Sequence, residues 1–436
     1  MKSKTPKVLH PLSGRPLVLY SVEAAAQVSS RVPVLVVGHA ENEVRTAVGD
    51  RVRYATQAEQ LGTGHAVAQA RTLLEGQSDH VIVIYGDMPL LRAETLQALY
   101  AAQCSSAGPF TMLTQITLNP RGFGRIVRDA AGSVLAIVEE ADATPEQKAI
   151  QEVNLGIYCF RADWLWGHLD QIPLSAKGEY YLTDLVAIAV GQGEQITAIT
   201  LDDPLEAIGI NTRVHLAEAE AALRQRINRE LMRSGVTMMD PAATYIHPGV
   251  QIGRDTLILP NTIIEGPTVI GEDCVIGPNT VIRASHIADG CEVRSSVVED
   301  SRLDQGVRVG PFARLRRGAH LEEDVYMGNF GEVKGSRLGR GVKMGHFSYV
   351  GDADVGEETN IGAGAITCNY DGVDKHPTTI GKRVFVGSST MLVAPLTLGD
   401  GARTGAGSVV TRDVPADTLV YGVPAKPKKL PESEDS

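Results

Sequence analysis

The clearest pattern in the chain is a six-residue repeat of apolar side chains in its C-terminal half. Aliphatic residues stand at every sixth position from Ile252 to Ile282, and after a stretch of blurred phase the repeat returns from Met327 to Val410. Neither an α-helix, with about 3.6 residues per turn, nor a strand, with a side-chain period of about two, has this spacing. The spacing is typical of a solenoid with three short sides per coil, so we predict a β-helix with about 18 residues per coil. An antiparallel barrel is the alternative, and the persistence of the six-residue phase argues against it.

The N-terminal half shows a different pattern, in which short apolar runs alternate with helical stretches. We expect strands at Val32–Val37, Val81–Tyr85 and Phe110–Ile116, and helices at Leu17–Ala26 and Ala66–Leu74. This alternation predicts an α/β domain with a parallel, Rossmann-like sheet and crossover helices.

One apolar stripe at helical spacing lies between the two halves, over residues 214–232. Its members are Leu216, Leu223, Ile227 and Leu231. Thr212 is a candidate cap and Gly235 a stop signal, so we predict a connector helix. The expected organisation is a nucleotide-binding type domain at 1–211, the connector at 212–235, the β-helix at 245–423 and a frayed tail at 424–436.

Composition limits the class of protein. The 436 residues are 43% hydrophobic and 21% charged, which is in the globular range and enough for two domains. A formal net charge of -11 argues against nucleic acid as a partner. The five cysteines are widely spaced and lack CxxC pairs, so neither a disulfide framework nor a zinc site is indicated. The chain has no apolar run of about 18 residues and no apolar leader, so we expect no membrane insertion and a cytoplasmic location.

The end of the expected strand Val81–Tyr85 carries the first candidate site. Gly86 and Asp87 follow this strand directly. Ligands of open parallel sheets bind beyond the carboxyl ends of the strands, and a carboxylate there suits Mg²⁺ bridging to a substrate phosphate. A simple Gly-Asp turn is the alternative on local grounds.

A series of short motifs surrounds this strand in the first 211 residues. They are Pro6-Lys7-Val8-Leu9, Gly14-Arg15-Pro16, the run from Gln57 to Gly64, Tyr85-Gly86-Asp87-Met88-Pro89, Gly124-Arg125-Ile126, Val138-Glu139, Asn154-Leu155-Gly156 and Gly209-Ile210-Asn211. In this order they resemble the sugar-1-phosphate nucleotidyltransferases. With the hexapeptide repeats behind them, the chain is similar over nearly its whole length to the bacterial bifunctional family that acetylates glucosamine-1-phosphate and uridylylates N-acetylglucosamine-1-phosphate.

The resemblance implies roles for residues of the N-terminal half. Gln57, Gly62 and Thr63 would hold the uracil of UTP, and Asp87 and Asn211 would bind Mg²⁺. Lys7 would face the nucleotide phosphates. The remaining expected contacts to substrate are Tyr85, Gly86, Gly124, Glu139 and Asn154. On local grounds Lys7 also fits a solvated lysine, and Asn154 and Asn211 fit turn asparagines.

One departure from that family concerns the start of the sequence. Family members begin with a strand and a loop of the form Leu-Ala-Ala-Gly-x-Gly-Thr-Arg-Met, whose backbone N–H groups cradle the phosphates. The present sequence begins at the final Met of that loop. Two interpretations stay open: a longer native chain, which we favour, or a shortened chain with impaired uridylyl transfer. For the sequence as written we expect an apolar sheet edge where the family has a central strand.

Coil spacing brings candidate residues of the C-terminal half together. Arg316 and Lys334 are separated by one predicted coil, so they should stack on adjacent coils, where two like charges need an anion such as a sugar phosphate. Solvated surface residues are the alternative. His346 comes two coil sides later, and a neutral imidazole is a common general base, although a structural histidine is the more usual occurrence. The repeat is interrupted between Asn369 and Ile380, and such insertions often build a site.

The resemblance assigns roles here too. His346 would be the general base and Glu332 would orient it, while Arg316, Lys334, Tyr349 and Asn360 would hold glucosamine-1-phosphate. Contacts to the sugar or to acetyl-CoA would come from Ala363, Asn369, Tyr370, Lys375, Ser388 and Ala406. The arginine that the family often has near Gly422, as a coenzyme A contact, is absent.

The resemblance thus implies a left-handed parallel β-helix, a homotrimer and a bifunctional transferase. Its co-substrates would be acetyl-CoA and UTP, with Mg²⁺ as the metal, and its products would feed peptidoglycan and lipopolysaccharide precursors. The first rival is the same two-domain layout acting on another sugar-1-phosphate. The second is a non-catalytic regulatory relative.

Overall fold

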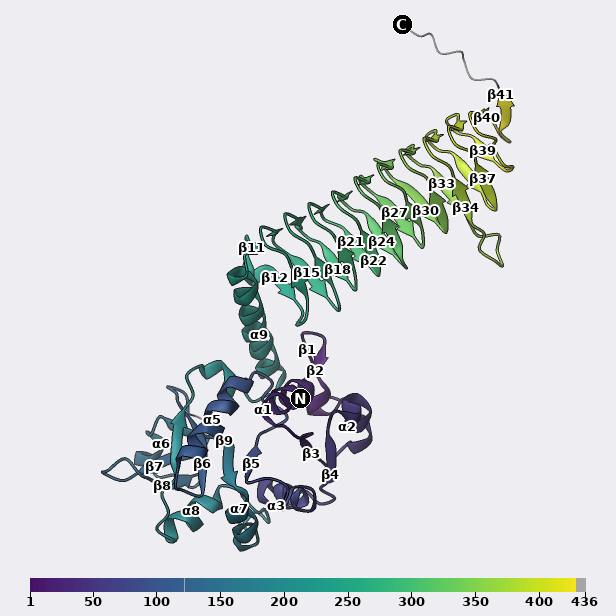
Figure 1. Ribbon diagram of the computed structural model, residues 1–436. Coiled ribbons are helices and arrows are strands. Elements are labelled where there is room, and N and C mark those ends of the chain that lie inside the picture. The colour runs from purple at the N-terminus through teal and green to yellow at the C-terminus, as the bar shows by residue number, and fades with distance from the viewer. Residues whose placement is uncertain (121, 429–436) are drawn as a thin grey trace. The chain divides into compact units, whose positions relative to one another are not determined.

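The computed structural model describes residues 1–120 and 122–428, and the chain divides into two compact units, Met1–Ala222 and Leu223 onward (Figure 1). Each unit is described by itself. No helix in the described part of the chain is long and apolar enough to cross a membrane.

The first unit is an α/β domain. Its strands are β1 (Pro11–Leu12), β2 (Arg15–Pro16), β3 (Val34–Val37), β4 (Arg53–Thr56), β5 (His80–Val83), β6 (Phe110–Ile116), β7 (Arg125–Arg128), β8 (Val134–Val138), β9 (Glu152–Arg161) and β10 (Thr197–Thr200). Its helices are α1 (Leu17–Val28), α2 (Glu41–Val48), α3 (Thr63–Gln69), α4 (Arg71–Leu74), α5 (Ala93–Ser105), α6 (Pro145–Lys148), α7 (Ala162–His168) and α8 (Asp184–Gly191). Short 3₁₀ helices lie at Lys7–Leu9, Gly49–Arg51, Leu169–Gln171 and Pro204–Ala207.

The alternation of strands and helices is confirmed, but the main sheet is mixed, where the alternation predicts a parallel sheet. The main sheet runs in the order β10-β6-β9-β7-β8, with β5 paired to β9. Strands β6 and β10 are parallel, whereas β9 runs antiparallel to β5, β6 and β7. The run that becomes β9 is almost entirely buried, and apolar content alone does not reveal strand direction. The expected helix at Ala66–Leu74 is also divided, into α3 and α4.

An apolar cavity lies between two strands that do not pair with each other. Strand β3 pairs only with β4, and β5 pairs only with β9, among the residues that the structure describes. Between them is a space of about 520 Å³ lined mainly by aliphatic side chains, including Val34 and Val36 of β3 and Val81 and Val83 of β5. Helix α1 contributes Val18, which is buried. The sides of β3 and β5 that line this cavity are unpaired among the described residues, and they correspond to the predicted apolar edge.

Helix α9 (Arg213–Arg233) is the predicted connector helix, and the division between the two units falls within it. In the second unit its last turns carry Ile227 and Leu231, which pack against the core of the β-helix. The side chain of Asn228 donates hydrogen bonds to the carbonyl oxygens of Pro241 and Thr244, which closes the base of the first coil.

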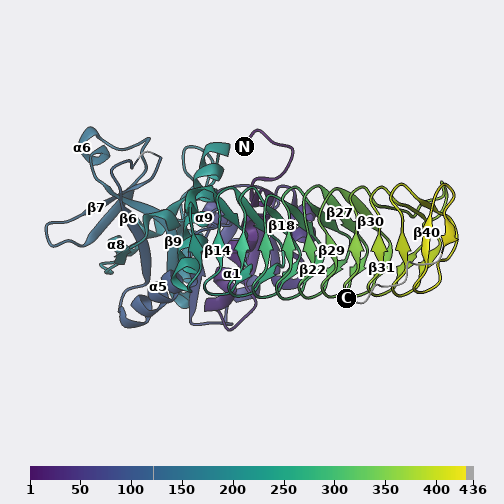
Figure 2. The ribbon, with the colours of Figure 1, turned by 90° about the horizontal axis from the view of Figure 1, so that it is seen from above.

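The second unit is a β-helix of three sheets whose strands are parallel except for the last one, β41, and each sheet takes one short strand per coil (Figures 1 and 2). The first sheet holds β11 (Thr237–Met238), β14 (Leu257–Ile258), β17 (Val275–Ile276), β20 (Glu292–Val293), β23 (Arg308–Val309), β26 (Tyr326–Met327), β29 (Lys343–Met344), β32 (Asn360–Ile361), β35 (Phe385–Val386), β38 (Arg403–Thr404), β40 (Leu419–Tyr421) and β41 (Lys426–Lys428). The second sheet holds β12 (Thr244–Ile246), β15 (Thr262–Glu265), β18 (Val281–Arg283), β21 (Val297–Glu299), β24 (Arg314–Arg316), β27 (Gly331–Lys334), β30 (Ser348–Gly351), β33 (Ile366–Cys368), β36 (Met391–Val393) and β39 (Val409–Val410). The third sheet holds β13 (Gln251–Ile252), β16 (Val269–Ile270), β19 (His286–Ile287), β22 (Ser301–Leu303), β25 (Ala319–Leu321), β28 (Arg337–Leu338), β31 (Ala353–Val355), β34 (Thr378–Ile380) and β37 (Leu396–Leu398). A short 3₁₀ helix lies at Pro241–Ala243.

The expectation of a coil of uniform length is wrong, and the difference explains the blurred phase. Val275 lies opposite Glu292, and Glu292 lies opposite Arg308, so both of these steps are shorter than the predicted coil. In these coils the corners are shorter and the strands keep their register. The inward side chains therefore still stack, although their spacing along the sequence is no longer six residues. Across the insertion the step is longer than the predicted coil, since Asn360 lies opposite Phe385.

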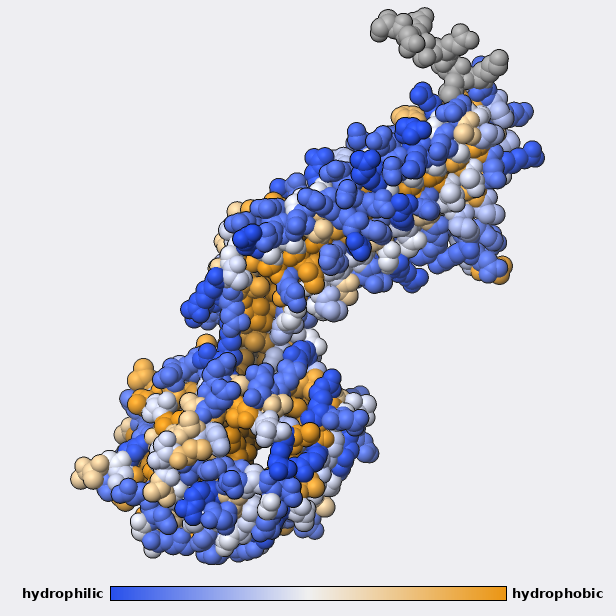
Figure 3. Space-filling model, in the orientation of Figure 1, coloured by the Kyte–Doolittle hydropathy of each residue, from blue (hydrophilic) through white to orange (hydrophobic). Residues whose placement is uncertain are grey.

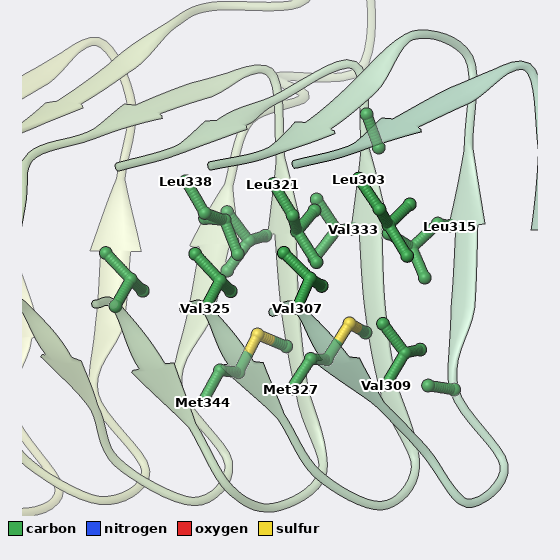
Figure 4. Close-up of a cluster of buried hydrophobic side chains, with 14 of the residues drawn as sticks. Leu303, Val307, Val309, Leu315, Leu321, Val325, Met327, Val333, Leu338 and Met344 are labelled. Carbon is green, nitrogen blue, oxygen red and sulfur yellow. The ribbon is translucent and has the colours of Figure 1, made fainter. Parts of the chain in front are cut away.

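The inward side chains form one continuous core. Figure 4 shows part of it, with Leu303, Leu321 and Leu338 in one column and Met327 and Met344 in another. All five of these side chains are fully buried. Burial of such columns is the main source of stability of a solenoid, since each coil covers the apolar face of the next.

The outer surface of the β-helix is mostly hydrophilic on the face shown in Figure 3, with apolar side chains gathered over α9 and the adjoining first coils. On the second sheet the outward positions of the first coils are Tyr245, Ile263, Val281 and Val297, which are in register on neighbouring strands. Tyr245 is 43% exposed. We call these four residues the apolar row.

The predicted frayed tail is wrong for its first residues. Strand β41 pairs antiparallel with β40, with Tyr421 opposite Lys426. The rest of the predicted tail, residues 429–436, lies outside the described residues.

Candidate functional site

Three distant segments meet near the carboxyl end of β5. Asp87 follows this strand, Lys7 begins the first 3₁₀ helix and Asn211 lies just before α9. The ammonium group of Lys7 donates to Asp87 Oδ2 at 2.6 Å and to Asn211 Oδ1 at 2.9 Å. The structure therefore brings together the expected metal ligands and the expected phosphate contact, with the lysine held between the two ligands.

Asp87 and Asn211 fit a magnesium ion. Carboxylate and amide oxygens are hard ligands, and Mg²⁺ commonly keeps several waters and substrate phosphates, so two protein ligands suffice. Both oxygens already bind one cation, the Lys7 ammonium, which shows that they can face a shared positive charge. In the described part of the chain no group of three or more His, Cys, Asp or Glu gathers as an alternative metal site.

The expected sugar contacts form a second group on the same sheet. The backbone N–H of Asn154 donates to the carbonyl oxygen of Gly124 at 2.9 Å, and Gly124 lies beside Glu139. The Asn154 side chain is buried and accepts from the backbone N–H of Gly156 at 3.0 Å, while its amide donates to the hydroxyl of Tyr158. The Asn154 side chain is therefore engaged within its own strand.

Two titratable groups of this region are perturbed by burial. Burial raises the pKa of Glu139 above its usual value, Lys177 opposes this shift, and Asp142 and Asp184 add to it. Burial, with smaller contributions from the carboxylates of Asp87 and Glu139, raises the pKa of Tyr85 to about 12. Glu139 is exposed as a residue, and a carboxyl with a raised pKa in a candidate binding site is a frequent mark of function. Gly86 lies between Tyr85 and Asp87, and a Cβ there would make only ordinary contacts.

The expected uracil contacts lie on the loop between β4 and α3. The side-chain amide of Gln57 donates to the carbonyl oxygen of Gly62 at 3.1 Å, and the hydroxyl of Thr63 accepts from the backbone N–H of Leu182 at 3.0 Å. Gly62 has φ of 96°, and a Cβ there would lie 2.6 Å from the carbonyl oxygen of Tyr180. Sequence reasoning missed Tyr180, whose backbone also bonds to Leu61 and Gly64, because no local pattern marks it.

In the β-helix, the predicted stacking of two basic residues is confirmed. Arg316 of β24 lies opposite Lys334 of β27. The accompanying argument that the pair needs an anion such as a sugar phosphate is met within the chain, because Arg316 donates to Glu332 Oε1 at 2.6 Å and Lys334 donates to both oxygens of Asp352, at 2.6 and 2.7 Å. Lys334 is also only 5% exposed.

The inserted loop adds a second lysine to this group. Proximity to Lys334 lowers the pKa of Lys375, Arg317 adds to this effect, and Asp352 opposes it. Lys375 and Arg317 therefore add positive charge near the Lys334–Asp352 pair, which favours a bound anion. The loop is ordered by Asp371, which accepts from the backbone N–H groups of Val373 and Asp374 and contacts His376 at 2.7 Å.

The expected general base lies at a corner of the coil. His346 is exposed in the turn between β29 and β30, and it forms no hydrogen bond with another described residue. Glu332, expected to orient this histidine, accepts a hydrogen bond from Arg316 at 2.6 Å in the described part of the chain, and its role beside His346 stays a prediction. Tyr349 lies opposite Glu332 on the next coil, and Asn360 lies opposite Lys343, so both expected sugar contacts face outward near the histidine turn.

The expected acetyl-CoA contacts occupy successive corners. The backbone N–H of Ser389 donates to the carbonyl oxygen of Ala363 at 2.7 Å, and that of Gly407 donates to the carbonyl oxygen of Ser388 at 2.8 Å. Ala363, Ser388 and Ala406 thus follow one another along one edge. Asn369 and Tyr370 lie at the base of the loop, where the backbones of Tyr370 and Lys375 form an isolated antiparallel β-bridge.

A further residue that sequence reasoning missed is Asp352. It lies one predicted coil after Lys334, and its backbone N–H donates to the carbonyl oxygen of Lys334 at 3.0 Å. Its Oδ2 accepts from the side-chain amide of Asn369 at 2.5 Å. The same coil spacing that pairs Arg316 with Lys334 would have found it.

The fold and the two sites define a two-part transferase, with a nucleotidyltransferase unit followed by an acyltransferase β-helix. The nucleotidyl transferase family matches residues 2–205, the bacterial transferase hexapeptide family matches 244–284, and the hexapeptide repeat of succinyl-transferase matches 377–412. Proteins named bifunctional protein GlmU are similar to nearly the whole chain. The one from Heliobacterium modesticaldum is 50% identical over 420 residues, covering 96% of this chain and 92% of the relative. Those from Pelobacter propionicus and a Geobacillus species are 49% and 47% identical over the same shares of both chains. This chain belongs to the GlmU family of bifunctional acetyl- and uridylyltransferases.

Proposed function

We propose that the chain first transfers the acetyl group of acetyl-CoA to glucosamine-1-phosphate and then transfers the uridylyl group of UTP to the acetylated product. The final products are UDP-N-acetylglucosamine, a precursor for cell-wall polymers, and pyrophosphate. The observation that supports the substrate assignment is the basic group of the β-helix, in which Arg316 stacks on Lys334 and Lys375 of the inserted loop lies close to Lys334. This group can receive the phosphate of an aminosugar phosphate.

Acetyl transfer needs a base and a fixed acceptor. The 2-amino group of the sugar attacks the thioester carbon, a C–N bond forms, the C–S bond breaks, and coenzyme A leaves as its thiol. His346 takes the proton of the attacking amine, because it is exposed and its ring is not engaged by the described residues. Arg316 and Lys334 hold the phosphate, which fixes the amine beside the base. Glu332 acts on Arg316 rather than on His346.

Uridylyl transfer mainly requires alignment and charge neutralisation. A phosphate oxygen of the acetylated sugar phosphate attacks the α-phosphorus of UTP, and the bond to pyrophosphate breaks. Gln57, Gly62 and Thr63 bind the uracil, and Glu139 accepts hydrogen bonds from the sugar. Asp87 and Asn211 would hold Mg²⁺, which supplies positive charge to the phosphates when it is bound. Lys7 lies beside this position and neutralises further phosphate charge.

The proposed base is tested by His346→Ala. Acetylation should fall by at least about a hundredfold, the usual contribution of a general base, while coenzyme A binding stays within threefold. His286→Ala, on the outer side of β19, is the matched control and should leave both unchanged. Near-normal turnover of His346→Ala would remove His346 from the mechanism.

The sugar is tested on the full chain with competing acceptors. Acetyl transfer to glucosamine-1-phosphate should greatly exceed any reaction with glucosamine-6-phosphate, and uridylyl transfer to N-acetylglucosamine-1-phosphate should exceed that to glucose-1-phosphate. A preference for glucose-1-phosphate would favour the rival in which this layout serves another sugar. Absence of both transfers would favour the non-catalytic relative.

We also propose that the working form is a homotrimer. The apolar row on the second sheet supports this, because aliphatic side chains in register on an outer face are better covered than exposed to water. Light scattering should give three times the chain mass, and Val281→Asp should reduce it. An unchanged mass for this variant would exclude the apolar row from the interface.

A further inference from the structure

We propose that Asp352 is a positioning residue of the acetyltransferase site, whose carboxylate holds Lys334 and the inserted loop in one arrangement. This inference rests on the proposed acetyl transfer to an aminosugar phosphate. It concerns a residue that touches neither substrate in our mechanism and acts through its neighbours.

The contacts of Asp352 extend over three successive coils. On the preceding coil it receives two hydrogen bonds from the Lys334 ammonium, at 2.6 and 2.7 Å. On the following coil its Oδ2 receives one from the Asn369 side chain at 2.5 Å. Its own carbonyl oxygen accepts from the backbone N–H of Thr378 at 3.1 Å, just beyond the loop. Asp352 therefore holds both ends of the insertion.

The electrostatic need for this carboxylate comes from the cations around it. Lys334 is nearly buried, and Lys375 of the loop is close enough to Lys334 for the two to repel each other. Burial raises the pKa of Asp352, but hydrogen bonds from Lys334 and Asn369 outweigh this and leave the pKa below its usual value. The side chain is therefore ionised at neutral pH. A buried ammonium that loses its partner is strongly unfavourable, so removal of this charge should drive the two lysines apart.

Geometry leaves room for a substrate on the same lysine. The ammonium group of a lysine has three donors, and Asp352 takes two of them. The third donor, together with Lys375, can then meet one phosphate. Asp352 thus fixes where the phosphate binds without occupying the whole of the cation.

The backbone at Asp352 makes asparagine a mild substitution. Asp352 has φ of 51°, in the left-handed region, which asparagine tolerates well. The equivalent corner positions of earlier coils hold Ala284 at φ 46° and Arg317 at φ 57°, so this corner also accepts longer side chains. Asp352→Asn removes the charge with the shape kept, and Asp352→Glu restores the charge on a longer side chain.

The test measures steady-state acetyl transfer and hydrogen exchange on the full-length chain. Asp352→Asn should raise KM for glucosamine-1-phosphate by about tenfold or more, lower kcat less than threefold, and speed amide exchange in residues 370–377. Asp352→Glu should return KM to within about threefold of the unmodified chain. Asp354→Asn is the matched control, since Asp354 is exposed and pairs with Arg337 at 2.8 Å on the third sheet. It should change none of these values.

Several results would overturn the proposal. An unchanged KM and unchanged loop exchange in Asp352→Asn would show that the carboxylate positions nothing, and a lowered KM would show that it competes with the substrate. Equal defects in Asp352→Asn and Asp352→Glu would show that charge is not the cause. Uridylyl transfer serves as an internal measure of folding and should be unaffected in all variants. If the unmodified chain does not acetylate glucosamine-1-phosphate, the proposed function fails, while the exchange measurement still tests Asp352.

Discussion

At the scale of single residues, both sites bind their own charges before any ligand arrives. Lys7 lies on Asp87 and Asn211, and Lys334 lies on Asp352. Such internal partners keep half-buried charges solvated by protein groups, which avoids the cost of leaving them unpaired. A ligand must therefore either displace the internal partner or bind beside it. We expect displacement of Lys7 at the first site and binding beside the Lys334–Asp352 pair at the second.

At the proposed metal site the internal partner, Lys7, and the metal ion are both cations, so they compete. We predict that Lys7→Met raises the affinity of the nucleotide-free chain for Mn²⁺ by about tenfold, because hydrogen bonds to charged groups are worth roughly 1.5–3 kcal/mol and the metal no longer has to displace them. Electron paramagnetic resonance of free Mn²⁺ measures this directly. Lys4→Met, on an exposed lysine of the same segment, is the control. Unchanged or weaker Mn²⁺ binding in Lys7→Met would show that the ammonium does not occupy the metal position.

At the sugar site the raised pKa of Glu139 gives a prediction about pH. Burial raises the pKa above the usual 4.5, so the carboxyl gains its proton at a higher pH than exposed carboxyls do. Because the ionised form is the better acceptor for sugar hydroxyls, KM for N-acetylglucosamine-1-phosphate should rise as pH falls toward that raised pKa. Glu139→Gln should have a high KM that hardly changes over the same range. Glu146→Gln, at an exposed glutamate whose pKa is lowered, should follow the unmodified profile. If KM of Glu139→Gln changed with pH as it does in the unmodified chain, the titrating group would not be Glu139.

At the scale of elements, the loop from Gln57 to Gly64 depends on one glycine. We predict that Gly62→Ala raises KM for UTP by about tenfold or more, because the added Cβ would lie 2.6 Å from the Tyr180 carbonyl oxygen and the loop would have to move. Gly76→Ala is a matched control for backbone strain, since Gly76 has φ of 70° and open space around it. It should cost about 1–2 kcal/mol of stability with little change in KM. Acetyl transfer should be normal in both, and equal KM values in the two variants would refute the steric argument.

The elements also show what the sequence could predict. The six-residue period predicts the coils because every side repeats the same local signal: one aliphatic residue inward and a turn after it. Coil length was not predictable in the same way, since corners shorten without changing that signal, as between Val275 and Arg308. Ion-pair partners were missed for a related reason. Asp352 carries no motif, and only its register beside Lys334 reveals it.

In the first unit, the limits of prediction have a different origin. Alternating strands and helices indicate the fold class, and the end of β5 indicates the site. The antiparallel course of β9 depends on long-range pairing with β5, β6 and β7, which no local pattern encodes. The same is true of Asn154, whose side chain bonds to Tyr158 and Gly156 within its own strand.

At the scale of the whole molecule, the two units differ in how their cores are built. The β-helix has one continuous core that runs from Val236 to Val420. The first unit has separate clusters: one contains Val18, Val22 and Val52, and others contain Val67, Val81 and Leu96. Residues of all these clusters line the cavity of about 520 Å³. Empty space inside a core forfeits packing energy, so we expect the first unit to be the less stable of the two.

This difference predicts the order in which activities are lost on heating. Uridylyl transfer should be inactivated at a lower temperature than acetyl transfer, and calorimetry should show two transitions of which the lower belongs to the first unit. The lower transition requires only that the separate apolar clusters around the cavity lose their contacts. The upper transition requires unfolding of the continuous core of the β-helix, in which neighbouring coils cover one another. Enlarging side chains that line the cavity, as in Val36→Ile, should raise the lower transition and leave the upper one in place. Val373→Ile, on an 83% exposed residue of the β-helix loop, is the control and should move neither. A single transition, or loss of acetyl transfer first, would show that the units unfold together and that the cavity does not set the stability of the first.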